Sequence, residues 1–355
     1  MDCRVEKFYG IQYLRGIAAG LVIIYHSMVM IAVAPYFDNP VGDFGVDIFF
    51  VISGFVMWVT TEGKNKGIRD FWVSRMLRVA PLYWLFTFVL VAAALLMPSL
   101  FFNSRGVDPV FLLKSLFFIP AQNPDVGDIT PVYTIGWTLT YEMFFYAIFG
   151  LSLALQNLRI RLLFIAVVIV ALAIVGSALT PEGPLGKTYT SPIIIEFLLG
   201  VLLGVTRQRW VGLGLLPTSL LVAASTVALV FADFTIFTRA LVYGVPAFFI
   251  VAGFVSFEKY IRSSINRGAL LLGEASYSLY LSHPISQRIW YVLFVTTFGQ
   301  ITSLAMAVWY AVGAVTAGLL GGIVCYLLVE RFLLKLAKMI SRSSLKSGPT
   351  IEVQR

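Results

Sequence analysis

Long unbroken apolar segments alternate with short polar ones along the whole chain of 355 residues. Segments such as LLFIAVVIVALAIVG hold no charged residue, and the longer segments approach the about 20 residues that an α-helix needs to cross a bilayer. A transmembrane β-barrel gives only weak alternation of apolar positions, so these runs favour helices. The pattern predicts an all-α polytopic membrane protein, a bundle of about ten transmembrane helices. The predicted spans cover residues 11–34, 44–61, 80–98, 136–155, 160–180, 191–206, 213–231, 239–257, 269–293 and 302–330.

The composition agrees with a chain that lies mostly in lipid. The sequence is 59% hydrophobic and 12% charged, and its mean hydropathy is +0.88. An average soluble domain is about 25% charged, so these values exclude a water-soluble globular enzyme. The two cysteines, Cys3 and Cys325, lie near opposite ends of the chain. Neither a disulfide framework nor a metal cluster is therefore predicted.

Basic residues are concentrated in every second loop, and the net charge is +8. The positive-inside rule assigns such loops to the cytoplasm, which predicts that both termini are cytoplasmic. Membrane topology then accounts for the net charge without a nucleic acid partner. The opposite loops hold little beyond Arg105, Lys114 and Lys187. The basic loops and tail hold Arg4, Lys7, Lys64, Lys66, Arg69, Arg75, Arg78, Arg159, Arg161, Arg207, Arg209, Lys259, Arg262, Arg267 and the residues from Arg331 onward.

The chain is predicted to form one transmembrane domain, residues 1–335, followed by a basic, disordered cytoplasmic tail, residues 336–355. No second, soluble domain is expected. The first span ends in AVA, which is typical of a cleavage site, but Pro35 follows it, so we expect an uncleaved span. The longest loop, roughly residues 99–135, is predicted to lie outside. Its apolar stretch FLLKSLFFIP is too short to cross the bilayer and is expected to lie at the interface as a cap.

Both histidines of the chain, His26 and His283, fall inside predicted spans. Ionisable side chains are costly in the bilayer and are functional candidates by default. Arg15 and His26 are eleven positions apart, which places them on one face of a helix, about 16 Å apart along its axis. This spacing favours an anion-binding entrance at Arg15 and a proton-handling group at His26. The structural alternative is an orientation anchor at Arg15 and an interhelical hydrogen bond at His26.

The segment GVDIFFVISGF opens the second span and places Asp47, Val51 and Gly54 along one helical stripe. A carboxylate is followed there by a position at which another backbone can approach, so Asp47 is either a site residue or part of helix packing.

Arg75 and Arg78 are one turn apart on a predicted cytoplasmic amphipathic helix that ends near Pro81. Two guanidinium groups on one face suit a phosphate-bearing ligand. The alternative is that they contact lipid headgroups and set the topology.

Four further ionisable residues in the predicted spans are considered singly. Glu142, in WTLTYEMFFY, is a candidate hydrogen-bond acceptor for a hydroxyl substrate or a partner for a histidine. His283 precedes Pro284 in SYSLYLSHPI, where a kinked helix frees carbonyls and widens a cavity, or is simply a structural kink. Glu196 is expected to pair with a neighbouring helix, as is Arg288 in the ninth span.

Taken in chain order, these segments resemble the membrane-bound acyltransferase type 3 family. The resemblance is carried by Arg15 with His26, GVDIFFVISGF, Arg75-x-x-Arg78 running into PLYW, WTLTYEMFFY and SYSLYLSHP, and it covers nearly the whole chain. The start, IQYLRGIAA, looks most like the exopolysaccharide O-acetyltransferases of that family.

The resemblance implies transfer of an acyl group, usually acetyl from acetyl-CoA, to a sugar hydroxyl of a polysaccharide or a lipid-linked oligosaccharide, at the bacterial cytoplasmic (inner) membrane. It marks Arg15 and His26 as the functional pair and Arg75 with Arg78 as the donor side, while Asp47, Glu142 and His283 occupy other motif positions. No metal is implied.

The basic loop between the second and third spans is predicted to bind the phosphates of the acyl-CoA donor. His26 is predicted to act as general base, with a transient acyl-imidazole as the competing role. A proton-coupled transporter or flippase is the alternative from another class, because intramembrane carboxylates and histidines also build proton relays. A transporter would give Arg75 and Arg78 no role other than setting the topology. Transporters also commonly show internal repeats of their hydropathy pattern, and this chain shows no convincing repeat. The loop's basic residues are Lys64, Lys66, Arg69, Arg75 and Arg78.

Overall fold

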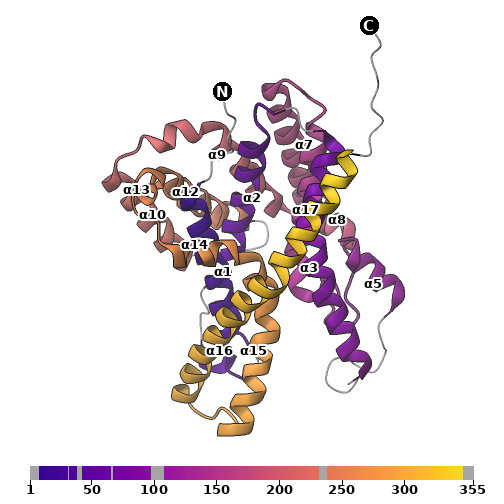
Figure 1. Cartoon of the computed structure of the whole chain (residues 1–355), viewed down its shortest axis with the longest axis vertical. Helices are drawn as coiled ribbons and strands as arrows, with labels where there is room; N and C mark the ends of the chain where they lie inside the picture. The colour runs from indigo at the N-terminus through magenta and orange to yellow at the C-terminus, as the bar shows by residue number, and fades with distance from the viewer. Residues whose placement is uncertain are drawn as a thin grey trace.

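The computed structural model describes residues 8–30, 32–37, 42–64, 67–96, 108–231 and 238–346. These residues form helices and turns with no strand, which confirms the all-α class (Figure 1). Each of the ten predicted spans coincides with at least one helix. The helices are α1 Tyr9–Met28, α2 Gly45–Thr61, α3 Ile68–Leu96, α5 Pro109–Leu116, α6 Trp137–Ser152, α7 Leu158–Leu179, α8 Pro184–Tyr189, α9 Ile195–Val211, α10 Leu215–Val230, α11 Arg239–Val242, α12 Gly244–Ser256, α13 Glu258–Ser263, α14 Arg267–Glu274, α15 Ser276–Phe298, α16 Leu304–Cys325 and α17 Arg331–Lys346, with a π-helical turn, Tyr326–Glu330, between the last two.

Five helical stretches of the described chain are long and apolar enough to cross a membrane. Two shorter apolar helices, α2 and α10, accompany them. The outward faces of α7 expose large apolar side chains such as Leu163 and Ile174, which suits a surface in contact with lipid. The protein is therefore a multi-pass membrane protein, while the total of ten spans and the cytoplasmic termini remain predictions. The five stretches are Ile68–Leu96, Leu158–Leu179, Pro184–Val211, Arg239–Ser263 and Leu304–Ala337.

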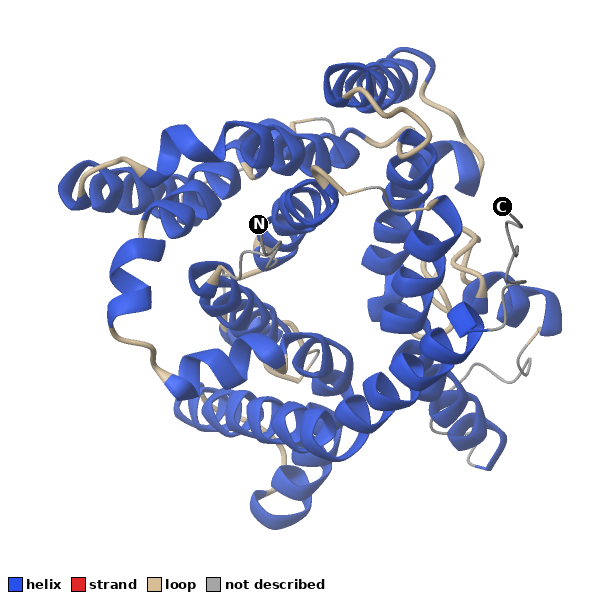
Figure 2. Ribbon diagram, turned by 45° about the horizontal axis from the view of Figure 1, so that its top comes forward, coloured by secondary structure: helices blue, strands red, loops and turns tan. Residues whose placement is uncertain are grey.

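Helix α1 lies inside the bundle and packs against α2, α12, α14, α15 and α16 (Figures 1 and 2). Its Gly16 and Gly273 of α14 make a close helix contact, because a Cβ on Gly273 would meet the Gln12 carbonyl. A second close contact joins α2 and α9, where Gly54 faces the carbonyl of Phe197. The predicted backbone approach at Gly54 is thus confirmed.

Several predicted boundaries differ from the structure. The first span was predicted to reach residue 34, but α1 ends at Met28 and a 3₁₀ turn that contains Pro35 follows. The ninth span is two helices, because the chain turns at Ala275 between α14 and α15. Helix α17 continues to Lys346, where a disordered tail was predicted from residue 336. Its first turn packs toward the core at Leu333, beside α3, and the helix extends from there.

Helix α3 is continuous from the amphipathic segment that holds Arg75 and Arg78 into the third span, although the sequence predicted that the amphipathic helix ends near Pro81. Pro81 has no N–H, so the Leu77 carbonyl four residues earlier lacks its helical partner. Near this point Tyr277 of α15 donates a hydrogen bond to the Val79 carbonyl, at 2.7 Å, and joins the two helices. Arg75 and Arg78 therefore lie on the membrane-spanning helix itself.

The predicted outer cap is partly helical. Helix α5 buries Phe111 and Ser115, and its C-terminal end is fastened to α3. Tyr83 donates to the Ser115 carbonyl at 3.2 Å, and the Trp84 indole N–H donates to the Leu116 carbonyl at 2.8 Å. The segment before α5, residues 97–107, lies outside the described residues.

Candidate active site

A cavity of about 130 Å³ lies where α1, α2, α3, α6 and α15 meet. An internal cavity of about 150 Å³ holds a benzene-sized molecule, so this space has room for a chemical group of a few heavy atoms. Three arginines and one carboxylate line it: Arg15, Arg75, Arg78 and Glu142. Aromatic side chains make up much of the rest of the wall, namely Phe49, Phe50, Tyr146, Tyr277 and Tyr280.

Arg75 is held by aromatic rings and retains an open hydrogen-bond donor. Its guanidinium carbon lies 5.7 Å from the centre of the Phe71 ring and 6.0 Å from that of Tyr146. Its Nε–H is buried and has no partner among the described residues. A planar cation placed in this way can donate to a phosphate or to another anionic group.

Glu142 lies on α6 and faces the cavity from a hydrogen-bonded position. Its Oε1 accepts a bond from Ser53 of α2 at 3.2 Å and another from the Tyr146 hydroxyl. These bonds fix the carboxylate between two helices. The sequence prediction named Glu142 but missed Ser53 and Tyr146, although both stand in the quoted motifs, because it selected charged side chains only.

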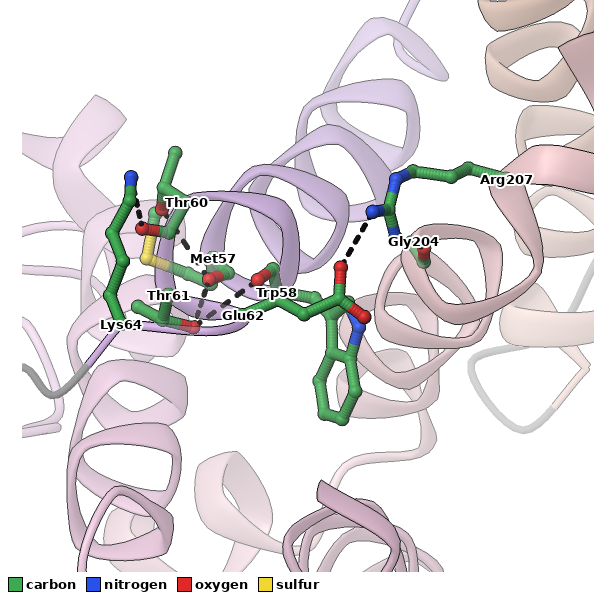
Figure 3. Close-up of polar contacts among 8 residues, drawn as sticks. All are labelled: Met57, Trp58, Thr60, Thr61, Glu62, Lys64, Gly204 and Arg207. Atoms are coloured by element: carbon green, nitrogen blue, oxygen red, sulfur yellow. Dashed lines mark hydrogen bonds and ion pairs between the residues drawn. The ribbon is translucent and has the colours of Figure 1, made fainter. Parts of the chain in front are cut away.

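The other basic residues of the predicted donor site do not line the cavity. The Lys64 ammonium turns back to the Thr60 carbonyl at 3.2 Å, beside the Glu62–Arg207 ion pair of 2.6 Å (Figure 3). Arg69 is exposed in the first turn of α3. Lys66 lies outside the described residues. Of the five predicted donor residues, the structure brings Arg75 and Arg78 to the cavity.

The two histidines form a pair, with ring centres 4.9 Å apart. His26 Nδ1 bonds to the Val22 carbonyl at 2.8 Å, and His283 Nδ1 bonds to the Leu279 carbonyl at 3.2 Å. A carbonyl only accepts, so each neutral imidazole carries its proton on Nδ1 and presents a bare Nε2. His283 Nε2 is buried without a partner among the described residues. The sequence singled out each histidine but did not predict that they would meet.

Arg15 and His26 lie at two different places along the site, although both are on α1. Arg15 lines the cavity and His26 does not. Tyr280 joins the two places, since it lines the cavity and its ring centre lies 6.2 Å from that of His283. Of the predicted pair, Arg15 therefore lies at the cavity, whereas His26 contacts His283, which in turn lies near Tyr280.

Asp47 is occupied by an ion pair that the sequence did not predict. Arg239 donates to both carboxylate oxygens, from Nε at 3.0 Å and from Nη2 at 2.7 Å. Asp43 lies 3.8 Å from the same guanidinium. Asp47 is fully buried and does not line the cavity, so the structure favours its role in helix packing. Arg239 stands alone in an apolar segment and offered no motif to find it by.

Among the described residues, no group of three or more His, Cys, Asp or Glu side chains could hold a metal ion. Along the sequence, residues 8–327 match the acyltransferase domain family. The chain belongs to this family. The match runs from α1 to the first residues of the π-helical turn, and takes in the arginine-lined cavity and the histidine pair.

Several curated proteins are similar to this chain. The exopolysaccharide production protein ExoZ of Rhizobium meliloti is 37% identical over 83% of this chain and 90% of its own length. The acyltransferase MdmB of Streptomyces mycarofaciens is 27% identical over 68% of this chain and 67% of its own. The O-acetyltransferase OatA of Staphylococcus aureus is 25% identical over 79% of this chain, which spans 51% of that protein. No solved structure matches the chain. The chain is therefore a membrane acyltransferase with O-acetyltransferase relatives.

Proposed function

We propose that this protein transfers an acyl group, in the first instance acetyl, from acyl-CoA to a sugar hydroxyl of an exopolysaccharide or another cell-surface glycan. The observation that carries the proposal is the arginine-lined cavity next to two histidines with bare Nε2 atoms, in a chain of this family. The similarity to an exopolysaccharide production protein and to an O-acetyltransferase supports the choice of acceptor and acyl group.

The donor occupies the arginine-lined cavity. Coenzyme A carries phosphates, and Arg75 and Arg78 supply two cations one turn apart on α3, with Arg15 opposite on α1. The aromatic wall suits the apolar part of the pantetheine chain. Glu142 keeps its place through two hydrogen bonds, so the cavity holds a cationic rim and a single oriented carboxylate. We place this rim on the cytoplasmic side of a bacterial inner membrane, because the basic loops predict that orientation.

His26 acts as the general base. A sugar hydroxyl is a weak nucleophile at neutral pH, and a bare imidazole Nε2 within hydrogen-bond reach removes its proton. The hydroxyl oxygen then attacks the thioester carbonyl carbon, the C–S bond breaks, and the thiolate takes the proton from the imidazolium. His283 supports the pair from α15, with its own Nε2 as a second acceptor. A transporter function would leave the arginines without a ligand.

The decisive experiment compares the surface polysaccharide of a deletion strain with that of its parent by NMR, before and after mild alkali. We expect the deletion to lose an alkali-labile ester at one sugar position, and the wild-type gene to restore it. An unchanged ester content would reject the proposal. Loss of the polymer itself, with the ester intact on intracellular precursor, would indicate transport instead.

A further inference from the structure

The donor cavity and the histidine pair are separated by one aromatic ring. Tyr280 lines the cavity, and its ring centre lies 6.2 Å from the His283 ring on one side and 6.2 Å from the Phe49 ring on the other. Phe49 also lines the cavity and packs toward Ala19 and the neighbouring α15. Neither histidine lines the cavity. The passage between the two places is therefore filled by Tyr280 and Phe49.

Hydrogen bonds hold the Tyr280 ring in this position. Its hydroxyl donates to the Ile135 carbonyl at 2.8 Å. Because that proton is used, the Thr138 hydroxyl, 2.8 Å away, donates to the Tyr280 oxygen. Both partners come from the start of α6 and the 3₁₀ turn before it. In the same region Tyr133 donates to the Leu281 carbonyl, one residue after Tyr280. The ring is 6% exposed, so it is buried and anchored at its far end.

This placement creates a requirement for the reaction. The distance from Arg15 to His26 along α1 is about 16 Å, because they are eleven residues apart. A donor whose phosphates bind the arginines must extend its thioester along α1 to reach the histidines. The cavity-lining stripe of α15 leads the same way, since His283 follows Tyr280 by three residues on one helical face. The acyl group must pass the Tyr280 ring.

We propose that Tyr280 is the partition between the donor cavity and the histidine pair, and that it opens to the acyl group only for transfer to the acceptor. This inference rests on the proposed acyltransferase function. A closed partition keeps the thioester away from the imidazole Nε2 atoms, which can activate a water molecule, and exclusion of water is how enzymes suppress hydrolysis of reactive groups. Tyr280 is a positioning residue here, since it controls access and takes no part in bond formation.

An open partition would allow a defined side reaction. A water oxygen would lose its proton to an imidazole Nε2 and attack the thioester carbonyl carbon. The C–S bond would break, a carboxylic acid would form, and the thiolate would take the proton. Acyl-CoA and water would thus give free acid and coenzyme A without any acceptor.

The test measures thiol release from acetyl-CoA by the purified full-length protein in lipid nanodiscs, with and without alkali-treated polysaccharide from the deletion strain. Tyr280→Ala should raise release without polysaccharide by about tenfold or more, and reduce ester formation per thiol released. Tyr280→Phe keeps the ring but loses both hydroxyl anchors, so a smaller rise is expected. Tyr291→Ala, on the same helix but away from the cavity, should behave as wild type.

Two outcomes overturn the partition. One is wild-type thiol release without polysaccharide in both Tyr280 variants, with folding verified by size-exclusion chromatography. The other is an equal rise in Tyr291→Ala. If Tyr280→Ala does not fold, Tyr280→Phe and Tyr280→Leu decide by the same criterion. Adding His26→Ala to a leaky variant should return release to background, since hydrolysis uses the imidazole.

Failure of the proposed function looks different in the same assay. A wild-type protein that releases no thiol with polysaccharide would reject acyl transfer itself. A wild-type protein that transfers the acyl group, together with Tyr280 variants that do not leak, would reject only the partition.

Discussion

Replacing Arg75 tests the donor cavity most directly, because the chain offers a matched control on the same helix. Arg75→Ala removes a half-buried guanidinium that lies over the Phe71 and Tyr146 rings and lines the cavity. Arg69→Ala removes the same charge from an exposed position on α3 that does not line it. The two variants change the net charge of the protein equally and differ only in the cavity.

The expected magnitude follows from the contacts that are lost. A hydrogen bond to a charged group contributes about 1.5 to 3 kcal/mol, which corresponds to roughly 10- to 150-fold in affinity. Arg75→Ala should therefore raise the dissociation constant for acetyl-CoA by about that factor. Arg75→Lys keeps the charge but loses the planar fork and its ring contacts, so it should fall between Ala and wild type.

Binding is measured by titrating acetyl-CoA against the purified protein in nanodiscs at low and high salt. The wild-type affinity should weaken with salt, because phosphate contacts are screened. Arg69→Ala should stay within about threefold of wild type, as expected for an exposed charge. Unchanged binding in Arg75→Ala, or an equal loss in Arg69→Ala, would show that the basic residues only set topology.

Three further results are expected. His26→Ala and His26→Gln should insert and bind acetyl-CoA normally but lose about 10²- to 10⁴-fold in transfer rate, and near wild-type transfer would end the base assignment. Asp47→Asn removes the negative charge that Arg239 contacts at 2.7 and 3.0 Å and leaves Asp43 at 3.8 Å, so the stability loss should stay below the about 3 to 5 kcal/mol of a fully broken buried pair, and the thermal unfolding temperature should drop. Gly54→Ala places a Cβ against the facing carbonyl of α9, so it should lower that temperature, by about 1 to 3 kcal/mol of stability. Gly20→Ala, with open space around it, should not.

The sequence predicted the helices well because burial in lipid forces a simple pattern. Each of the ten long apolar runs coincides with at least one helix, so the apolar pattern alone predicts where helices lie. The ends were harder to predict, because they depend on partners. Helix α3 passes through Pro81 and is joined to α15 near that point by the hydrogen bond from Tyr277 to the Val79 carbonyl, and α14 separates from α15 near Gly273, which meets the backbone of α1. Neither contact is encoded in local hydropathy.

The ionisable residues that line the cavity were predicted from the sequence, whereas its aromatic wall was not. Arg15 and Glu142 were conspicuous because ionisable side chains are rare within spans, and Arg75 and Arg78 because they are one turn apart in the predicted basic loop; all four line the cavity. Asp47 was equally conspicuous and is an ion-pair partner of Arg239 instead. An isolated charge in a span thus indicates that a partner exists, but it does not tell whether that partner is a ligand or another helix.

Helical spacing predicts that Arg15 and His26 share one face of α1, but it does not say why one helix should carry both residues. The proposed reaction gives a reason for their separation along α1. Donor phosphates and the base need to be apart by the length of the carrier chain, and eleven residues of helix set about 16 Å between them. His283 meets His26 from a parallel stripe on α15, whose Tyr280 stands between the two ends. In the proposed partition, uncharged Tyr280 controls whether the thioester meets an acceptor or water.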